Sequence, residues 1–409
     1  MKAVPIFLAF GFAYFFSALL RGVTATLAPV FSAELGLRAA ELGLLAGAYF
    51  FGFAALQLPL GRALDKHGPR RTLIALLALA VLGCAGFAMA PGLPEMIAAR
   101  VCIGAGVAAC LMAPLTSYRR LFSAGAQLRA NSWMLMTGSL GMLASTLPVQ
   151  WLMPHWGWRG LFWAVAGSLA LAMLLLAWCV PADKVQPDSP TAAADIGYGA
   201  IVRHPLFTRL APLGFFLYGG LIAVQSLWAG PWLTHVGGAS AEHAARGLFF
   251  INLCMLLTFM TWGALMPRLH KHGIDAMRLI AWGVPLALLM LVVNVWRGAQ
   301  AGVGSWALWC VLCTFVSVAQ PAVGQVFPAS QAGRALSAFN LVIFGGVFCV
   351  QWGIGLLVDA FRAAGLADAD AFRSSFAAFG GCCLVSYLWF LRRRRQPADN
   401  PVTAPWLQS

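Results

Sequence analysis

Charged residues are scarce in this chain of 409 residues. Asp, Glu, Lys and Arg together make up 10% of it, and only 13 residues are acidic. Because a soluble domain carries about 25% charged residues, this composition excludes an ordinary water-soluble fold. Hydrophobic residues make up 61% of the chain. The protein therefore needs a surrounding that accepts apolar side chains, and the lipid bilayer is the one that fits.

Acidic residues are also missing from the middle of every long apolar stretch. All 13 fall in expected loops, in tails or at the ends of apolar segments, and no His lies deep in such a segment. Proton-driven membrane proteins commonly relay protons through a buried acid or His. The sequence therefore predicts no relay of that kind.

Patterns typical of enzymes and of cofactor or metal sites are lacking too. No nucleophile stands with a base in a catalytic arrangement, and no Gly-rich stretch has the Lys of a phosphate-binding loop. Cys310 and Cys313 have the spacing of metal ligands but lack a partner pair. We interpret the ten cysteines as small hydrophobic side chains. We predict no enzymatic activity, no cofactor and no metal site.

What the sequence does contain is a series of twelve apolar segments of about 20 residues or more, each long enough to cross the bilayer as a helix. They predict an all-α integral membrane protein with the lipid bilayer as its surrounding. The segments lie near residues 5–30, 40–60, 71–90, 94–118, 130–153, 160–180, 208–234, 243–266, 274–296, 303–326, 334–358 and 371–391.

Basic residues are distributed unevenly between the loops of the two sides. Of 27 Lys and Arg residues, nineteen fall on the side of the termini. Such an excess marks the cytoplasmic side, so we predict a multi-pass protein of the bacterial inner membrane with both termini in the cytoplasm. The net charge of +14 is then explained by the orientation of the protein in the membrane. We therefore predict no nucleic-acid partner. Seven arginines are expected on the opposite side: Arg38, Arg100, Arg159, Arg246, Arg297, Arg362 and Arg373.

A polar stretch at 182–206 divides the chain into two blocks of six apolar segments. We predict an N-terminal bundle over 1–181, a cytoplasmic linker over 182–206, a C-terminal bundle over 207–395 and a cytoplasmic tail over 396–409. Several residues recur at a constant offset of 205 positions, which indicates a duplicated six-helix unit with pseudo-twofold symmetry. The recurring pairs include Gly68 and Gly273, Phe122 and Phe327, Arg129 and Arg334, and Gly141 and Gly346.

Residues 61–71 form a charged segment bracketed by glycines, which we expect to be a short aqueous loop. The segment resembles the loop between helices 2 and 3 of the major facilitator superfamily, and the matching residues are Gly61, Asp65, Lys66, Gly68, Arg70 and Arg71. The resemblance implies a transporter of small molecules, active as a monomer, in which two six-helix halves rock about a central site.

The resemblance also implies a gate at the cytoplasmic side. We group Arg129 and Arg334 with the motif residues as its candidates. In the second copy His270 replaces the Asp, so the gating role would rest on Asp65 alone. The alternative is that Asp65 is a solvated loop carboxylate.

Arg21 is the one charged residue that we place deep inside a predicted span. An arginine at a helix centre costs about 2.5–3.5 kcal/mol to insert, so it normally faces a partner or a wet cavity. With no embedded acid nearby, an anionic substrate is its most natural partner. Ser17 and Thr24 share its helical face and Tyr14 lies a further turn along. The alternative is that Arg21 extends to the lipid headgroups.

A narrower resemblance concerns the first two segments. Arg21, Pro29, Glu34–Leu37, Gly47 and the sequence from Gln57 to Gly61 are similar to those of anion-transporting branches of the superfamily. This implies an organic or inorganic anion as substrate. The offset of 205 places Ser226 opposite Arg21, so a second cation is missing. A monovalent carboxylate is then favoured over a divalent phosphate ester.

Further candidates come from segments that line the cavity in that fold. A buried amide can hydrogen-bond either a ligand or a neighbouring helix, and a tryptophan can stack on a ligand or only pack. Both alternatives stay open. The predicted substrate-binding residues are Arg21, Tyr14, Ser17, Thr24, Gln225, Ser226, Trp228, Gln320 and Asn340.

We therefore predict a secondary active or facilitative transporter that moves a small solute, preferably an anion, by alternating access. Three alternatives remain. One is an exporter of neutral or hydrophobic compounds. A second is a metal-ion importer that uses Cys254, Met255 and Met260, although their spacing does not put them on one helical face. The third is a non-transporting receptor on the same fold.

Overall fold

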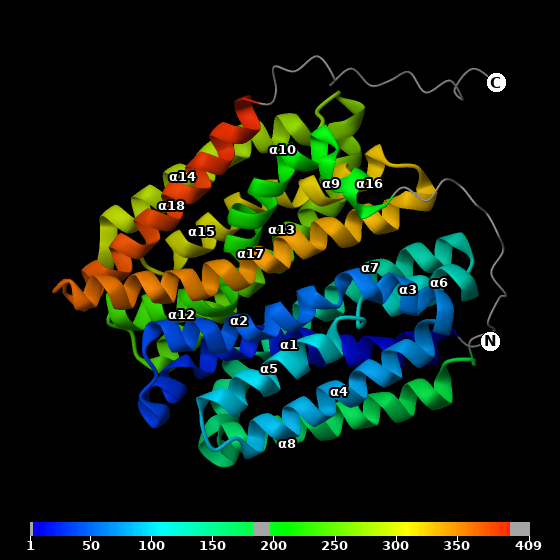
Figure 1. Ribbon diagram of the computed structural model, residues 1–409, viewed down its shortest axis with the longest axis horizontal. Helices are drawn as coiled ribbons and strands as arrows, with labels where there is room; N and C mark the ends of the chain where they lie inside the picture. Colours follow the sequence, from blue (N-terminus) through cyan, green and yellow to red (C-terminus); the bar gives the residue numbers. More distant parts are fainter. Residues whose placement is uncertain (1–2, 183–196, 393–409) are drawn as a thin grey trace.

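The computed structural model describes residues 3–182 and 197–392, and all regular structure within these ranges is helical (Figure 1). The predicted tail over 396–409 lies outside the described residues, as does most of the predicted linker. The described end of that linker contains a short helix, α9 (Tyr198–Arg203), and α10 begins directly after it at Pro205.

The described part of the first half, residues 3–182, contains eight helices. They are α1 (Ala3–Leu35), α2 (Ala39–Ala55), α3 (Gln57–His67), α4 (Pro69–Met89), α5 (Leu93–Val107), α6 (Met112–Leu121), α7 (Ala124–Ala144) and α8 (Leu147–Cys179).

The second half begins with α9 and contains several short π and 3₁₀ segments, marked η. The elements are α10 (Pro205–Leu213), η1 (Gly214–Tyr218), α11 (Gly219–Ala223), η2 (Val224–Trp228), α12 (Ala229–Pro231), η3 (Trp232–Val236), α13 (Ala241–Lys271), α14 (Ala276–Arg297), η4 (Gly298–Gln300), α15 (Val303–Cys313), η5 (Thr314–Val318), α16 (Ala319–Val326), α17 (Ala329–Ala363) and α18 (Asp368–Arg392).

Each of the twelve predicted segments coincides with helical structure. Ten helices of the described chain are long and apolar enough to cross a bilayer, and an eleventh is added if α2 and α3, bent by 42°, count as one. The predicted segment 130–153 covers α7 and the first part of α8. Gly157 (φ 62°, ψ 173°) divides α8 into two helices, so the fifth and sixth predicted segments meet there.

The predicted aqueous loop over 61–71 is wrong in its extent. Helix α3 continues to His67, and the chain leaves helical geometry only at Gly68, with φ 80°, before Pro69 starts α4. Leu60 and Leu64 are buried on one face of α3, which holds this segment in a helix. A positive φ is readily adopted only by glycine, so Gly68 alone makes the turn.

The internal repeat is visible in the backbone. Gly68 and Gly273 both adopt positive φ, at 80° and 71°. A Cβ at Gly141 would collide with the carbonyl of Phe15, and one at Gly346 with the carbonyl of Phe215. Both glycines thus allow a close crossing with the first long helix of their own half. Equivalent packing at equivalent positions supports two six-helix bundles related by a repeat.

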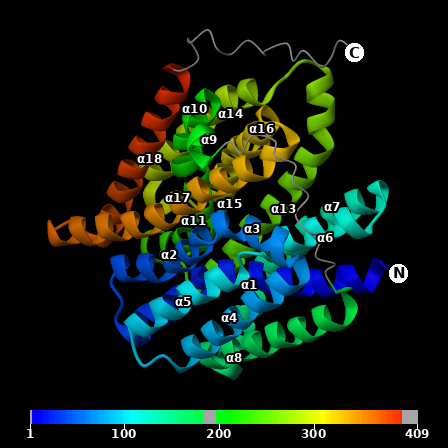
Figure 2. The ribbon, with the colours of Figure 1, turned by 45° about the vertical axis from the view of Figure 1, so that its right-hand side comes forward.

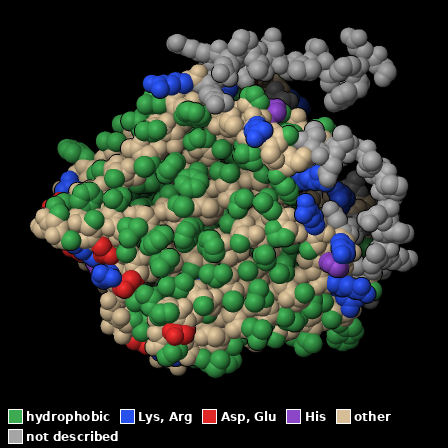
Figure 3. All heavy atoms as spheres, viewed as in Figure 1, with side chains coloured by type: hydrophobic (Ala, Val, Ile, Leu, Met, Phe, Trp, Pro, Cys, Tyr) green, Lys and Arg blue, Asp and Glu red, His purple; other side chains and the backbone are tan. Residues whose placement is uncertain are grey.

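The two bundles lie side by side, with α2 and α17 adjacent across their interface (Figures 1 and 2). The molecular surface is largely apolar, as a bilayer requires, and Lys and Arg side chains gather at the end where the chain begins (Figure 3). We call this the basic end; it carries Lys66 and Arg71. The opposite, acidic end carries Glu34, Asp359 and Asp368.

Arg100, which we expect on the side opposite the termini, is buried inside a helix. It sits two turns inside α5 and is 1% exposed. Its Nη1 donates to the carbonyl of Leu20 at 3.2 Å, and its guanidinium lies 5.7 Å from the ring centres of Tyr49 and Phe87. Arg21 is therefore not the one charge inside the helical bundle, and the acidic-end loops carry one arginine fewer than expected.

Candidate functional site

A cavity of about 740 Å³ lies between the two bundles. Its lining comes from α1, α2, α3, α7 and the break between α5 and α6 in the first half, and from η1, α11, η2, α13, α16 and α17 in the second. Of the described residues that line it, Arg21 is the only charged one. The polar lining residues are Tyr14, Ser17, Arg21, Gln57, Ser132, Ser139, Tyr218, Gln225, Asn252, Gln320 and Asn340.

The side of the cavity formed by the first bundle carries the positive charge, and we call it the cationic wall (Arg21, Tyr14 and Ser17). The guanidinium of Arg21 lies 5.8 Å from the ring centre of Phe53, and it interacts electrostatically with the hydroxyls of Tyr14 and Tyr49. Its Nε has no hydrogen-bond partner among the described residues.

Tyr49 of α2 supports the cationic wall from behind. Its hydroxyl donates to the carbonyl of Ser17 at 3.2 Å, and its side chain is 1% exposed. The bond ties α2 to α1 one turn before Arg21. The position of the guanidinium is therefore fixed by packing within the first bundle.

The second bundle presents amides, and we call this side the carboxamide wall (Gln225, Asn252, Gln320 and Asn340). Gln225 Nε2 donates to Asn252 Oδ1 at 2.8 Å, and Gln320 Nε2 donates to Asn340 Oδ1 at 2.6 Å. No described residue bonds the Oε1 atom of either glutamine. Each pair thus orients a glutamine that can both accept and donate hydrogen bonds.

Apolar side chains line the cavity between the two walls. They include Trp133 and Met136 of α7, Phe259 and Met260 of α13, and Phe344 of α17. Trp133 and Met260 are 55% and 57% exposed, and α7 and α13 diverge from one another (Figure 2). The cavity is therefore suited to a largely apolar or planar organic molecule that carries polar groups at its edges.

The bundles are in direct backbone contact at the acidic end. A Cβ at Gly43 of α2 would collide with the carbonyl of Gln351 in α17, and one at Gly230 would lie 2.8 Å from the carbonyl of Ala25. Contacts this close leave no passage for a solute. The cavity is closed at the acidic end, and its lining extends along α7 and α13 toward the basic end.

Six of the nine predicted binding residues line this cavity, and three do not. Thr24 is 1% exposed and lies beyond the cavity toward the acidic end, next to the contact at Ala25. Ser226 accepts a bond from Gln351 Nε2 at 3.0 Å, and the indole of Trp228 donates to the Gln351 carbonyl at 3.0 Å. Neighbouring residues of a helix point in different directions. Ser226 therefore faces the interior of the second bundle, whereas Gln225 faces the cavity.

The predicted gating residues lie at the basic end. Arg70 donates to the carbonyl of Ala177, which belongs to the same bundle. The side chains of Lys66, Arg71, Arg129 and Arg334 are exposed. Gly61 lies within α3 and Gly68 caps that helix. The side chain of Asp65 is outside the described part of the structure, so its role stays a prediction.

Sequence reasoning missed the contribution of α2 and α3. Phe53 and Gln57 line the cavity, and together with Tyr49 they follow one another at intervals of four residues. That spacing puts all three on one helical face. A stripe of polar and aromatic residues in the second apolar segment could therefore have indicated that this segment lines the cavity.

Comparison with known proteins identifies the family. The profile of the Major Facilitator Superfamily matches residues 10–319, more than half of the chain. The chain belongs to the major facilitator superfamily. It is a membrane transporter by family and fold, and not an enzyme.

Two relatives with different named functions resemble the chain. The chain is 28% identical over 323 residues to a riboflavin transporter, RfnT, of Brucella anthropi, which covers 76% of this chain and 78% of the relative. It is 31% identical over 237 residues to a chloramphenicol resistance protein of Streptomyces lividans, which covers 57% of each.

Solved structures share the fold. A bacterial homolog of the human lysosomal transporter Spinster, in an inward-facing and occupied conformation, superposes with a TM-score of 0.78 at 18% identity and covers 98% of both chains. A D-xylose–proton symporter superposes with a TM-score of 0.72 at 16% identity and covers 95% of this chain and 96% of its own. At these identities the likeness shows the fold alone.

Proposed function

We propose that this transporter moves an organic anion by alternating access, and that the anionic group binds at Arg21. The observation that carries the proposal is that Arg21 is the single charged residue among the described cavity lining. A guanidinium in a water-poor site prefers a carboxylate or a similar planar anion. The rest of the ligand contacts the apolar lining and hydrogen-bonds the carboxamide wall.

The size and lining of the cavity favour an organic over an inorganic anion. A volume of about 740 Å³ is typical of sites for drug-sized ligands, which bind in mostly apolar pockets with a few polar groups. Aromatic and methionine side chains contribute much of this lining. The similarity to a riboflavin transporter supports a planar molecule with a hydrogen-bonding edge.

The charge of the ligand bears on energy coupling. No Asp, Glu or His is among the described residues that line the cavity. In our proposal the protein therefore works as an exchanger or a uniporter, or a proton crosses on the carboxyl group of the substrate itself.

For the membrane orientation, we propose that the basic end faces the cytoplasm of a bacterium, with both termini on that side and a monomer as the working unit. The gathering of Lys and Arg at that end supports this orientation (Figure 3). The cavity lining, which extends toward the basic end, then corresponds to an inward-facing state.

A second candidate function is export of neutral or hydrophobic compounds. The largely apolar lining of α7 and α13 favours it, as does the similarity to a chloramphenicol resistance protein. In this case Arg21 would stabilise the bundle rather than bind substrate.

A thermal-shift screen of the purified protein separates the two candidates. The panel consists of matched pairs that differ in charge, such as nicotinate and nicotinamide, or riboflavin 5′-phosphate and riboflavin, together with aromatic carboxylates, sugar acids and chloramphenicol. A ligand that binds the folded state raises its apparent stability. Our proposal expects the anionic member of a pair to stabilise the protein more. Equal or greater stabilisation by the neutral members would favour the exporter.

A further inference from the structure

At the start of α2, the side chain of Glu41 caps the N–H of Arg38, but the N–H groups of Ala39 and Ala40 are bonded by no side chain of their own segment. The N-cap residue, Arg38, has no side-chain acceptor to offer the first helical N–H groups. Glu41 accepts bonds from the N–H of Arg38 at 2.8 Å and from its Nη2 at 3.5 Å, so its carboxylate is directed at the residue before the helix. The first N–H groups of a helix have no partner within the helix, so water or another segment supplies the acceptor.

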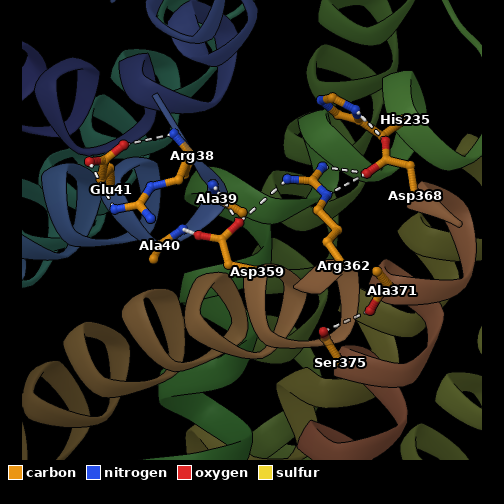
Figure 4. Close-up of polar contacts among 10 residues, drawn as sticks. All are labelled: Arg38, Ala39, Ala40, Glu41, His235, Asp359, Arg362, Asp368, Ala371 and Ser375. Carbon is orange, nitrogen blue, oxygen red and sulfur yellow. Dashed lines mark hydrogen bonds and ion pairs between the residues drawn. The ribbon is translucent and has the colours of Figure 1, made fainter. Parts of the chain in front are cut away.

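Asp359 of α17 supplies it from the other bundle. Its Oδ1 accepts a bond from the N–H of Ala39 at 3.2 Å, and its Oδ2 accepts one from the N–H of Ala40 at 2.8 Å (Figure 4). The partners are about 320 positions apart in the chain. A carboxylate on the first turn of a helix also interacts favourably with the positive end of the helix dipole.

The backbone of α17 is shaped to deliver this carboxylate. Gly355 lies one turn before Asp359, and a Cβ there would collide with the carbonyl of Ala39. The absence of a side chain lets α17 approach the start of α2 closely. Residues four apart share one helical face, so the turn that follows directs Asp359 at the same place.

Asp359 is also fixed to its own bundle. Arg362 Nη1 lies 3.5 Å from Asp359 Oδ1, and Arg362 Nε donates to Asp368 at 2.7 Å. His235 of η3 pairs with the other oxygen of Asp368 at 2.9 Å (Figure 4). The carboxylate therefore moves with the second bundle when the bundles separate.

We propose that Asp359 is a positioning residue of the transport cycle, which holds the acidic end closed by capping α2 across the bundle interface. When the acidic end opens, the N–H groups of Ala39 and Ala40 lose this charged acceptor. The cap thus stabilises the state in which the cavity reaches the basic end, relative to the opposite state. The proposal rests on alternating access, but not on the substrate or on Arg21.

Hydrogen–deuterium exchange of the full-length protein in lipid nanodiscs, without added ligand, tests this role. In Asp359→Asn we expect exchange to rise by about threefold or more in peptides covering the start of α2 and the end of α17, the size expected for loss of one helix cap. Exchange should fall in the basic-end parts of α7 and α13, since they close as the other end opens. Asp370→Asn is the matched control, because Asp370 pairs only with Arg373 of the same helix, at 2.9 Å.

A rise confined to the start of α2, no change at all, or the same pattern in the control would overturn the proposal. If Asp359→Asn instead raises exchange throughout the chain, Ala39→Pro decides the matter. Proline is well tolerated at the first position of a helix, and it removes one of the two N–H donors while keeping the carboxylate. In Ala39→Pro we then expect a smaller rise in exchange at the start of α2 and the end of α17, together with a smaller fall in the basic-end parts of α7 and α13. The absence of this combination would contradict the role of Asp359. Because no ligand is present, either result is independent of whether Arg21 binds an anion.

Discussion

The two walls of the cavity differ in chemistry although the two bundles arise from one repeat. The first bundle contributes a guanidinium among phenol hydroxyls, and the second contributes two amide pairs. At the position that repeats Arg21, Ser226 is turned away from the cavity and bonded to Gln351. The repeat thus preserved the packing of the bundles and not the chemistry of the site.

This difference suggests how one ligand contacts both bundles. An anionic end at the cationic wall and a hydrogen-bonding edge at the carboxamide wall would place the substrate across the interface. A ligand that binds both bundles stabilises states in which they are close around it, and binding energy that differs between states is what shifts a conformational equilibrium. Each wall can be altered separately, which makes the comparison testable.

The largest effect on ligand binding is expected from Arg21→Gln. A hydrogen bond to a charged group contributes about 1.5–3 kcal/mol, so the dissociation constant of an anion should rise about 10- to 150-fold. The neutral member of a matched pair should bind almost as before. Equilibrium binding to the purified variant measures both values. Arg246→Gln is the control, because Arg246 is exposed and pairs with Glu242 within α13; an equal loss in that variant would contradict a specific role for Arg21.

Arg100 sharpens the comparison within the first bundle, because it is buried but does not line the cavity. Arg100→Met removes the bond to the Leu20 carbonyl and should lower the stability of the protein by about 1–3 kcal/mol. Scanning fluorimetry without ligand should show a lower apparent Tm for this variant, and little change for Arg21→Gln. The distinction between the two arginines fails if Arg21→Gln is the less stable variant.

On the opposite wall, Gln320→Leu removes one neutral hydrogen-bonding group. We expect binding to weaken by about 2- to 13-fold, because such a bond contributes about 0.5–1.5 kcal/mol. The factor should be the same for the anionic and neutral members of a pair, since they share the edge that this wall contacts. If Gln320→Leu weakens binding of the anionic ligand alone in the same assay, the anionic group contacts the carboxamide wall, which would contradict its binding at Arg21.

A smaller effect is expected from Gly138→Ala. The added Cβ would lie 2.5 Å from Cε1 of Tyr14, so the ring has to shift and its hydroxyl moves relative to Arg21. A loss of about 0.5–1 kcal/mol, or about two- to fivefold in binding, follows if the tyrosine contributes one hydrogen bond. Gly167→Ala is the control because open space surrounds that position. Unchanged ligand binding in Gly138→Ala would show that Tyr14 does not contact the ligand.

The fold followed from the sequence because the bilayer imposes a simple rule. Apolar segments of sufficient length, a polar break near 182 and the recurring glycines were enough to predict two helical bundles. Arg21 is predictable as a site residue because an isolated charge in an apolar helix is costly without a partner or a wet cavity. The same reasoning applies to Arg100, but the sequence analysis counts it only among the arginines of the side opposite the termini, and it lies two turns inside α5.

The finer details of the site depend on geometry that composition does not reveal. The π-helical turns η1, η2 and η3 and the 42° bend between α2 and α3 alter which side chains face inward. Gln57 enters the cavity at that bend, whereas Trp228 packs behind η2. The cap by Asp359 joins segments about 320 positions apart, and nothing local in either segment indicates the other.

Charge recognition by Arg21 is measured as the discrimination between the two members of one matched pair. The ratio of the dissociation constants of the neutral and the anionic ligand is determined for the wild type, Arg21→Gln and Gln320→Leu. Our account predicts that the ratio falls to about one in Arg21→Gln and keeps its wild-type value in Gln320→Leu, although both variants bind more weakly. A ratio that survives in Arg21→Gln, or collapses in Gln320→Leu, would contradict the assignment of charge recognition to the cationic wall.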